Sequence, residues 1–148
     1  MLKRHLTSCA ALTVFCALAS GSALSNFAES QYRAERAEVP SNVDGIKTAQ
    51  LGYNATFDTY LPCERTPQGE PGKEARDWPY MATEDFDTLG WAPDGQVRGV
   101  YWVTTSWGDG NADFTVHGIS DVDGDGVQAH YTATRSINST LVTPMDVY

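Results

Sequence analysis

Residues 113–134 read DFTVHGISDVDGDGVQAHYTAT, and this stretch decides the fold that the sequence predicts. Its last part alternates two sets of side chains, with Val127, Ala129, Tyr131 and Ala133 on one face and Gln128, His130, Thr132 and Thr134 on the other. Such alternation of apolar and polar residues is typical of a β-strand with one buried face. The acidic segment between the two strand-like halves then predicts a turn, so that the two halves pair in antiparallel fashion.

Asp-Gly pairs punctuate the chain on both sides of this turn. They occur at Asp94-Gly95, Asp109-Gly110 and Asp125-Gly126, spaced 15 and 16 residues apart. Asp-Gly supplies the positive φ that tight hairpin turns require. Regular turn spacing without a helical pattern predicts an antiparallel β-meander over residues 86–148.

Residues 26–60 carry the pattern of an α-helix instead. Apolar residues recur there at spacings of three, four and seven, which makes one stripe along a helix: Val39, Val43, Ile46, Tyr53, Phe57 and Tyr60. Glu29 and Arg33 are four residues apart and can pair. Pro40 is expected to kink or break the helix, and Gly45 to weaken it. The sequence thus predicts an α+β fold, in which a long N-terminal α-helix packs on an antiparallel β-sheet of about four strands.

Residues 61–85 are expected to form an irregular connector. The segment LPCERTPQGEPGKEARDWPY, residues 61–80, holds four prolines and two glycines, which fit neither a regular helix nor a long strand. Trp78 and Tyr80 are expected to anchor this connector to the body. The next segment, EDFDTLGW (84–91), is interpreted as the start of a strand on the surface.

Residues 1–25 differ from the rest of the chain. A basic start, MLKRH, precedes an apolar run rich in small residues, which is the pattern of an export signal. Gly21-Ser22-Ala23 offers a small-x-small cleavage site after Ala23. The alternative is an N-terminal membrane segment, since residues 6–24 are about as long as a bilayer-spanning helix. We therefore predict export to the cell envelope, with anchoring in the inner membrane if the segment is retained.

Charge and cysteine content narrow the function. The 148 residues include 19 acidic and 10 basic ones, for a formal net charge of −9. Such a surface repels nucleic acid, so nucleic-acid binding is not expected. Cys63 is the one cysteine in the body of the chain. In an oxidising compartment a lone thiol is either buried or paired with another chain, and a partly buried Cys63 under a loop is the favoured interpretation.

The turn DVDGDG, residues 121–126, is the candidate metal site. Asp121, Asp123 and Asp125 match the first half of a calcium-binding EF-hand loop, and the carbonyl of Val127 offers a fourth ligand. The second half does not match, because Thr132 stands where that loop has glutamate. Three close carboxylates repel one another unless a cation gathers them. The interpretation is a calcium site in a hairpin loop, and the alternative is a solvated polar turn.

Catalysis has little support in the sequence. No serine-hydrolase, zinc-protease or phosphate-loop motif occurs. His117 and His130 are expected to face each other across the 121–126 turn, but cross-strand polar neighbours are common without a transition metal. Four tryptophans are interpreted as core residues, with a carbohydrate platform as the alternative: Trp78, Trp91, Trp102 and Trp107. We predict that the protein is not an enzyme.

Three stretches resemble type IV pilins and pilin-like proteins of bacteria. They are SNFAESQYRAERAEVPSNVDGIKTAQLGY (25–53), LGWAPDGQVRGVYWV (89–103) and DFTVHGISDVDGDGVQAHYTAT (113–134). The resemblance identifies residues 26–148 as a pilin-like head domain, with helix 26–60, connector 61–85 and meander 86–148. Residues 1–25 are a degenerate form of the family's N-terminal segment, with Ala, Ser, Thr and Cys where the family has Ile, Leu and Val.

The resemblance implies a structural role. Members of the family are not enzymes; they assemble with other pilin-like subunits into a type IV pilus or into the short pseudopilus of a secretion system. Pseudopilins as a class bind calcium in their β region, which agrees with the interpretation of Asp121, Asp123, Asp125 and Val127. The expected function is a minor structural subunit located in the periplasm, at the inner membrane or in an extracellular pilus. The alternative is a soluble exported pilin-like binding module outside any filament.

Overall fold

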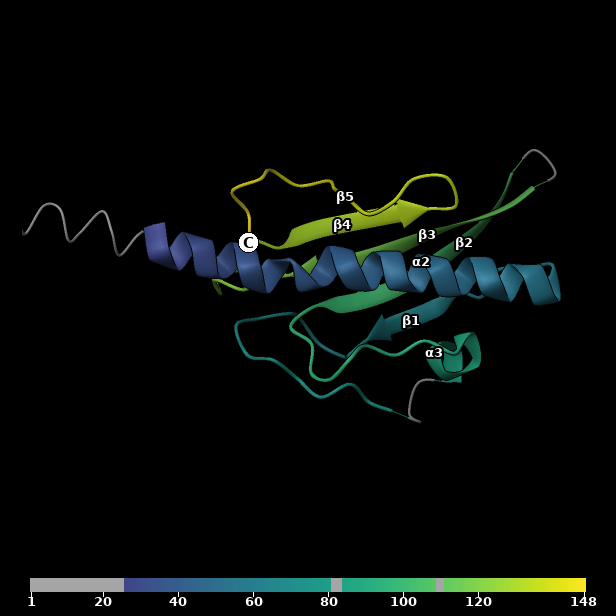
Figure 1. Ribbon diagram of the computed structural model, residues 1–148, viewed down its shortest axis with the longest axis horizontal. Helices are drawn as coiled ribbons and strands as arrows, with labels where there is room; N and C mark the ends of the chain where they lie inside the picture. The colour runs from purple at the N-terminus through teal and green to yellow at the C-terminus, as the bar shows by residue number, and fades with distance from the viewer. Residues whose placement is uncertain (1–25, 81–83, 109–110) are drawn as a thin grey trace, which may run out of the picture. The chain divides into compact units, whose positions relative to one another are not determined.

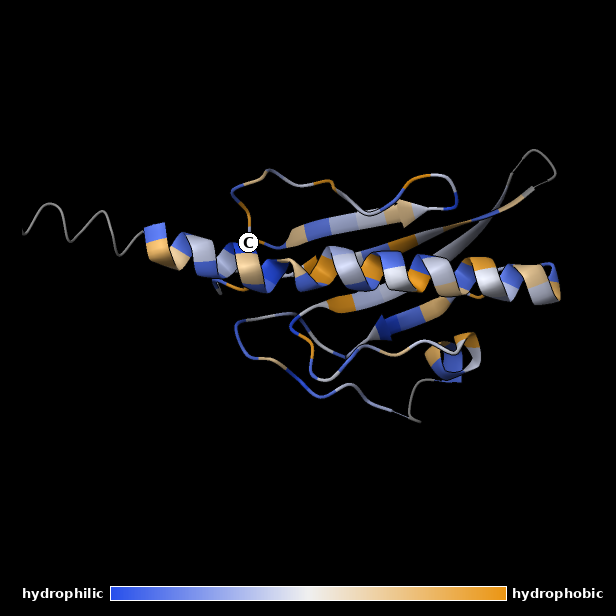
Figure 2. Cartoon of the chain, viewed as in Figure 1, coloured by the Kyte–Doolittle hydropathy of each residue, from blue (hydrophilic) through white to orange (hydrophobic). Residues whose placement is uncertain are grey.

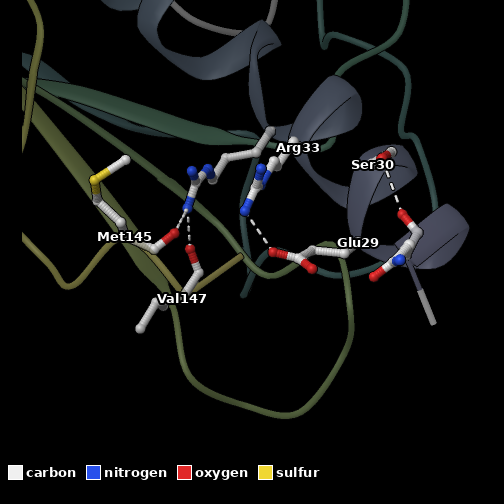
Figure 3. A network of polar contacts seen from close by, with 7 residues as sticks. Glu29, Ser30, Arg33, Met145 and Val147 are labelled. Carbon is white, nitrogen blue, oxygen red and sulfur yellow. Dashed lines mark hydrogen bonds and ion pairs between the residues drawn. The ribbon is translucent and has the colours of Figure 1, made fainter. Parts of the chain in front are cut away.

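The computed structural model describes residues 26–80, 84–108 and 111–148 (Figure 1). The chain divides into two units, one ending at Arg33 and the other comprising Ala34–Tyr148. In the first unit, residues 26–33 are helical, and the side chain of Arg33 pairs with that of Glu29 (Figure 3). This confirms the ion pair expected from the spacing of four. The predicted turn at Asp109-Gly110 and the predicted segment 1–25 lie outside the described residues.

The helix predicted over residues 26–60 is interrupted once and ends early. Residues 26–36 are helical, Ala37 is a turn, and α2 then runs over Glu38–Phe57. Pro40 has no N–H to donate to the carbonyl of Arg36, four residues earlier. The interruption at Ala37 directly follows Arg36. At the other end Asp58 takes the left-handed conformation (φ 56°), and its N–H donates to the Asn54 carbonyl at 2.8 Å. Residues 58–60 are therefore not helical, contrary to the prediction.

The sheet has five strands in the order β1-β2-β3-β4-β5, and every neighbouring pair is antiparallel. The strands are β1 (Cys63–Thr66), β2 (Val100–Gly108), β3 (Asn111–Ser120), β4 (Ala129–Thr134) and β5 (Thr140–Leu141). The predicted α+β class and the meander connectivity are confirmed. The predicted number of about four strands is one too few, and the meander begins at Val100 or, with β1, at Cys63, rather than at residue 86.

The structure adds a short strand to the predicted connector, and it contradicts the strand start predicted for residues 84–91. The connector contains strand β1, which fits between Pro62 and Pro67 because it is short and lies at the sheet edge, where proline is tolerated. The segment interpreted as a strand start is a short helix, α3 (Glu84–Leu89). Three acidic residues in its first turn favour a helix N-terminus. Phe86 and Leu89, spaced three apart, bury one face of α3.

Helix α2 covers one face of the sheet, where it packs against β3 and β4 (Figure 1). Its apolar residues are interleaved with polar ones along the helix (Figure 2). Val39, Val43 and Ile46 are almost fully buried, as the predicted stripe requires. The stripe fades toward the C-terminal end, where Tyr53 is half-buried and the Phe57 side chain is 60% exposed.

Two glycines allow α2 and its neighbours to approach closely. A Cβ added to Gly118 in β3 would lie 2.6 Å from Val43 Cγ2 and 2.8 Å from Val39 Cγ1. A Cβ added to Gly45 in α2 would lie 2.8 Å from Trp91 Nε1. Gly45 therefore makes room for an indole ring, which explains a residue that weakens the helix intrinsically.

Three sets of hydrogen bonds join the C-terminal third of the chain to α2 and to Arg36, which precedes α2. The buried Arg36 guanidinium donates to the carbonyl oxygens of Met145 and Val147, and these two residues are labelled in Figure 3. Asp44 accepts hydrogen bonds from the Ser139 N–H at 2.7 Å and from its hydroxyl at 2.8 Å. Lys47 Nζ donates to Asn138 Oδ1 at 2.8 Å. These contacts hold irregular backbone in place where no strand does so.

Candidate metal centre

Residues 121–128 join β3 to β4, so the DVDGDG turn lies at one end of the central hairpin. Gly124 (φ 67°) and Gly126 (φ 87°) both take positive φ. An L-residue with a side chain rarely adopts these values, so the two glycines allow a turn that other residues would strain. The alternate aspartates are thereby turned toward one point instead of to opposite faces, as they would be in a strand.

The three predicted carboxylates do converge. Oxygen atoms of Asp121, Asp123 and Asp125 all lie within 4.8 Å of one another. Asp121 is buried, and it accepts hydrogen bonds from the main-chain N–H groups of Asp125 (3.1 Å) and Gly126 (3.2 Å). Asp125 Oδ1 accepts one from the Val127 N–H at 2.7 Å. The loop therefore holds its carboxylates in place by its own backbone, before any ligand binds.

Asp123 has the most unfavourable surroundings for a negative charge. Its Oδ1 atom is buried, and no described residue donates a hydrogen bond to it. Burial raises the pKa of the Asp123 carboxyl; the charges of Asp125 and Asp121 raise it further, although the main-chain bond at Asp125 lowers it. A cation at the centre of the cluster would relieve these costs, because it supplies the missing partner and cancels the repulsion.

Clustered carboxylate oxygens are hard ligands, which suit calcium or magnesium rather than a soft transition metal. Magnesium prefers several waters and few protein ligands, so the cluster fits calcium better. Thr132 lies in β4, which agrees with the sequence-based conclusion that this loop is not an EF-hand. The fourth predicted ligand, the carbonyl of Val127, stays a prediction, since the contact shown at that residue is made by its N–H.

Lys73 is a neighbour of the loop that the sequence analysis missed. A Cβ added to Gly124 would lie 2.5 Å from Lys73 Cε, so the lysine stem passes directly over the turn. Within the described part of the chain, no ion pair joins Lys73 to the three aspartates. The contact brings together residues 51 positions apart, and no local sequence signal indicates it.

The tryptophans do not form one exposed platform. Trp78 is buried against Phe86, with ring centroids 5.3 Å apart, and Trp91 is half-buried beside it. Trp102 lies on the sheet face opposite α2, and Trp107 is 76% exposed near the end of β2. The core interpretation is confirmed for Trp78. Tyr80, expected to anchor the connector, is 56% exposed and is held by one hydrogen bond from its hydroxyl to the Pro93 carbonyl.

Cys63 is buried in β1 and forms no disulfide. Its thiol lies 3.7 Å from the Leu61 carbonyl oxygen, to which it donates. Burial, with a smaller contribution from the charge of Asp85, raises the pKa of the Cys63 thiol to about 12. A buried, neutral thiol agrees with the favoured interpretation and makes Cys63 a poor nucleophile.

In the part of the chain that the structure describes, no helix combines the length and the apolar character that crossing a membrane requires. The prediction of a signal peptide or membrane segment concerns residues outside that part. Comparison with protein-family models, with curated proteins and with solved structures finds no match to this chain.

Proposed function

We propose that this chain is an exported, non-enzymatic, pilin-like structural subunit of the cell envelope, in a type IV pilus or a secretion-system pseudopilus. The observation that carries the proposal is the placement of α2 across one face of an antiparallel meander. This is the arrangement that the sequence resemblance implies for a pilin head. The resemblance of the polar segment ahead of α2 adds to it.

The outer surface of α2 fits packing against other helices. Its exposed residues include several small side chains at spacings of seven, four and three, which share one side of a helix: Ser41, Thr48, Gly52 and Ala55. Small residues let helix backbones approach closely. In a filament, this surface would face the helices of neighbouring subunits, while the sheet faces outward.

Calcium binding by Asp121, Asp123 and Asp125 is the second part of the proposal. The convergence of the carboxylates and the unpartnered Asp123 oxygen support it. The calcium concentration outside the cytoplasm is high enough to fill a weak site, with a dissociation constant of roughly 0.1–1 mM as in extracellular modules. Its role would be to stiffen the end of the β3–β4 hairpin.

Assembly is tested in the cells that produce the protein. A photo-reactive amino acid replaces Thr48 on the outer surface of α2, and the matched control carries it at exposed Ile137, between β4 and β5. We expect the protein in sheared surface filaments or in the membrane fraction, with cross-links to other pilin-like subunits from position 48 and fewer from position 137. Recovery of all the protein as a soluble, uncross-linked exported species would overturn the filament role and favour the soluble module.

Calcium binding is tested on the purified chain by thermal melting with about 5 mM calcium or with chelator. A site of the affinity just given stabilises the fold by about 1–2.5 kcal/mol. We expect a calcium-dependent rise in Tm that disappears in the double variant Asp123→Asn/Asp125→Asn. Asp113→Asn, which alters an exposed aspartate outside the turn, is the control and should keep the rise. If the wild-type Tm does not respond to calcium, residues 121–126 form a polar turn without a metal site.

A further inference from the structure

His117 and His130 meet on the face of the sheet opposite α2. The Cα of Gly118 faces α2, so the side chain of its neighbour His117 lies on the opposite face of the sheet. Tyr131 pairs with Gly118 and shares its face, so the side chain of His130, the neighbour of Tyr131, also lies on the face opposite α2. The two histidines are diagonal neighbours across β3 and β4, with Nδ1 of His117 3.2 Å from Nε2 of His130. Their rings are 27° from coplanar with centroids 5.4 Å apart, so the two nitrogens face each other along the line between the rings.

Trp102 and Thr104 fix the orientation of this pair. The indole of Trp102 stacks on the His117 ring, with centroids 4.7 Å apart and an interplanar angle of 6°. It also stacks on the His130 ring, with centroids 5.8 Å apart and an interplanar angle of 23°. Thr104 Oγ1 lies 3.2 Å from Nε2 of His117, so the hydroxyl can accept a hydrogen bond from an N–H at that nitrogen, which leaves Nδ1 with its lone pair. Such an outer partner is what orients a metal-ligating histidine. The two rings are thus held next to each other before any ligand arrives.

A carbohydrate platform does not account for the cluster. The side of Trp102 toward β3 is occupied by the two imidazoles, and Arg65 on β1 lies over the ring with its Cζ 5.1 Å from the centroid. Because β1 and β3 flank β2 on opposite sides, the two faces of the indole are both covered. The groups left to bind a ligand are the imidazole nitrogens themselves.

Burial keeps both imidazoles uncharged, although one of the two facing nitrogens carries a proton. Burial lowers the pKa of His117 and of His130, and His117 is lowered further by the charge of its neighbour. The pair is therefore neutral at pH 7, with one proton in the contact between the two nitrogens and a lone pair on the acceptor. A neutral imidazole is the ligand form for zinc and copper.

We propose that Nδ1 of His117 and Nε2 of His130 form a two-histidine site for a divalent transition ion, taken up most tightly as Cu²⁺ and less tightly as Zn²⁺. Metal–nitrogen bonds of about 2.0–2.1 Å at angles between square-planar and tetrahedral place two ligand nitrogens roughly 2.9–3.4 Å apart. The observed 3.2 Å lies in that range. Imidazole favours copper over zinc in the usual affinity order of the divalent ions.

Binding requires both rings to turn, because their two nitrogens now point at each other, and it requires no net change of protons. Each ring turns about its bond to Cβ until the two lone pairs converge on the ion. The proton of the contact moves through solvent to the other nitrogen of its own ring, so both imidazoles stay neutral. Water fills the remaining positions. Nitrogen ligands also separate this site from the Asp121–Asp125 cluster, whose oxygens prefer calcium.

The site is tested by titrating the purified full chain with Cu²⁺ while tryptophan fluorescence and the copper electron paramagnetic resonance spectrum are recorded. We expect one equivalent of Cu²⁺ to bind with nitrogen hyperfine structure from two imidazoles and to quench part of the emission, since Trp102 stacks on both ligands. His117→Gln and His130→Gln should each weaken binding at least tenfold, the loss that removal of even an outer-shell partner causes.

Controls separate the pair from other copper ligands and from misfolding. His5→Gln removes the remaining histidine and should leave Cu²⁺ binding unchanged, as should Asp123→Asn/Asp125→Asn. Trp102→Phe removes the indole that stacks on both ligands and should lose the quenching. Far-ultraviolet circular dichroism of each variant verifies the fold. Unchanged Cu²⁺ affinity in both histidine variants, or a spectrum without histidine nitrogen, would overturn the proposal, whatever the outcome for calcium or filament assembly.

Discussion

Replacing Gly118 tests the packing of α2 on the sheet. Gly118 lies in the second half of β3, and the side chains that an added Cβ would strike belong to Val43 and Val39 of α2, at 2.6 and 2.8 Å. Ordinary contacts lie at 3.4 Å or more, so helix and strand must separate by several tenths of an ångström. Neither valine can turn away, because both are almost fully buried and β-branched side chains have one strongly preferred rotamer in a helix.

Two opposing effects set the size of the change in Gly118→Ala. Overpacking a closed core costs about 1–3 kcal/mol, whereas replacing glycine by alanine in a strand relieves about 0.5–1 kcal/mol of backbone entropy. Taking about 2 kcal/mol for the first effect and about 0.75 kcal/mol for the second, the net loss in the free energy of unfolding is roughly 1–1.5 kcal/mol, or about 3–6 °C in Tm for a domain of this size. Gly118→Val should lose more, since its second methyl meets the same valines.

Gly52→Ala is the matched control. Gly52 lies in α2, and an added Cβ has no atom within 4 Å. Alanine there should raise the free energy of unfolding by about 0.5–1 kcal/mol, because only the backbone effect remains. Both variants are measured by urea and thermal unfolding of the purified chain. A Gly118→Ala variant as stable as wild type, beside a stabilised Gly52→Ala, would refute the close approach of α2 to β3.

Three further predictions concern single side chains. Lys73→Met keeps the stem over the acidic turn but removes the charge, so the calcium dissociation constant from titration calorimetry should fall roughly two- to fivefold, the size of an exposed charge pair. Arg36→Met leaves the Met145 and Val147 carbonyls without their donor, which should cost about 2–3 kcal/mol and speed cleavage of residues 143–148 by carboxypeptidase. For Cys63, a thiol pKa of about 12 instead of 9.0 leaves roughly 100- to 1,000-fold less thiolate at pH 8. Alkylation of Cys63, followed by mass spectrometry, should therefore be slow until denaturant is added, and it should stay slow when the pH is raised to 9.

The central sheet was predictable because its signal is local. Burial in β4 alternates along Ala129–Thr134, as the alternation of side chains predicted, and the pattern needs no knowledge of distant residues. The flanking strands β1 and β5 gave no such signal, since four and two residues are too few for a period. They exist because β2 and β4 offer them hydrogen-bonding partners. Strand content at the sheet edges is thus a property of the assembled fold.

The same distinction holds for the candidate sites. The three aspartates lie within one turn, so their spacing alone predicted that they converge. His117 and His130 were predicted to face each other because a hairpin turn fixes which residues of its two strands are neighbours. Lys73 and Arg36 reach their partners from 51 and 109 or more residues away, and nothing in their local sequence marks them. Contacts within one hairpin are therefore predictable from the sequence, whereas contacts between distant segments depend on the whole fold.

The acidic turn is linked to the start of α2 through the C-terminal segment. The Val122 N–H, inside the turn, donates to a main-chain oxygen of Tyr148 at 3.3 Å. The Tyr148 ring lies under the Arg36 guanidinium, with the Arg36 Cζ 4.8 Å from its centroid, and Arg36 also donates to the Val147 carbonyl. A cation that orders the turn therefore orders the Val122 backbone, to which Tyr148 is hydrogen-bonded. It thereby also orders Tyr148 and Val147, which are the partners of the Arg36 guanidinium. Calcium at Asp121, Asp123 and Asp125 would act on the helix by this route, because Val122 is hydrogen-bonded to Tyr148, and Arg36 contacts both the Tyr148 ring and the Val147 carbonyl.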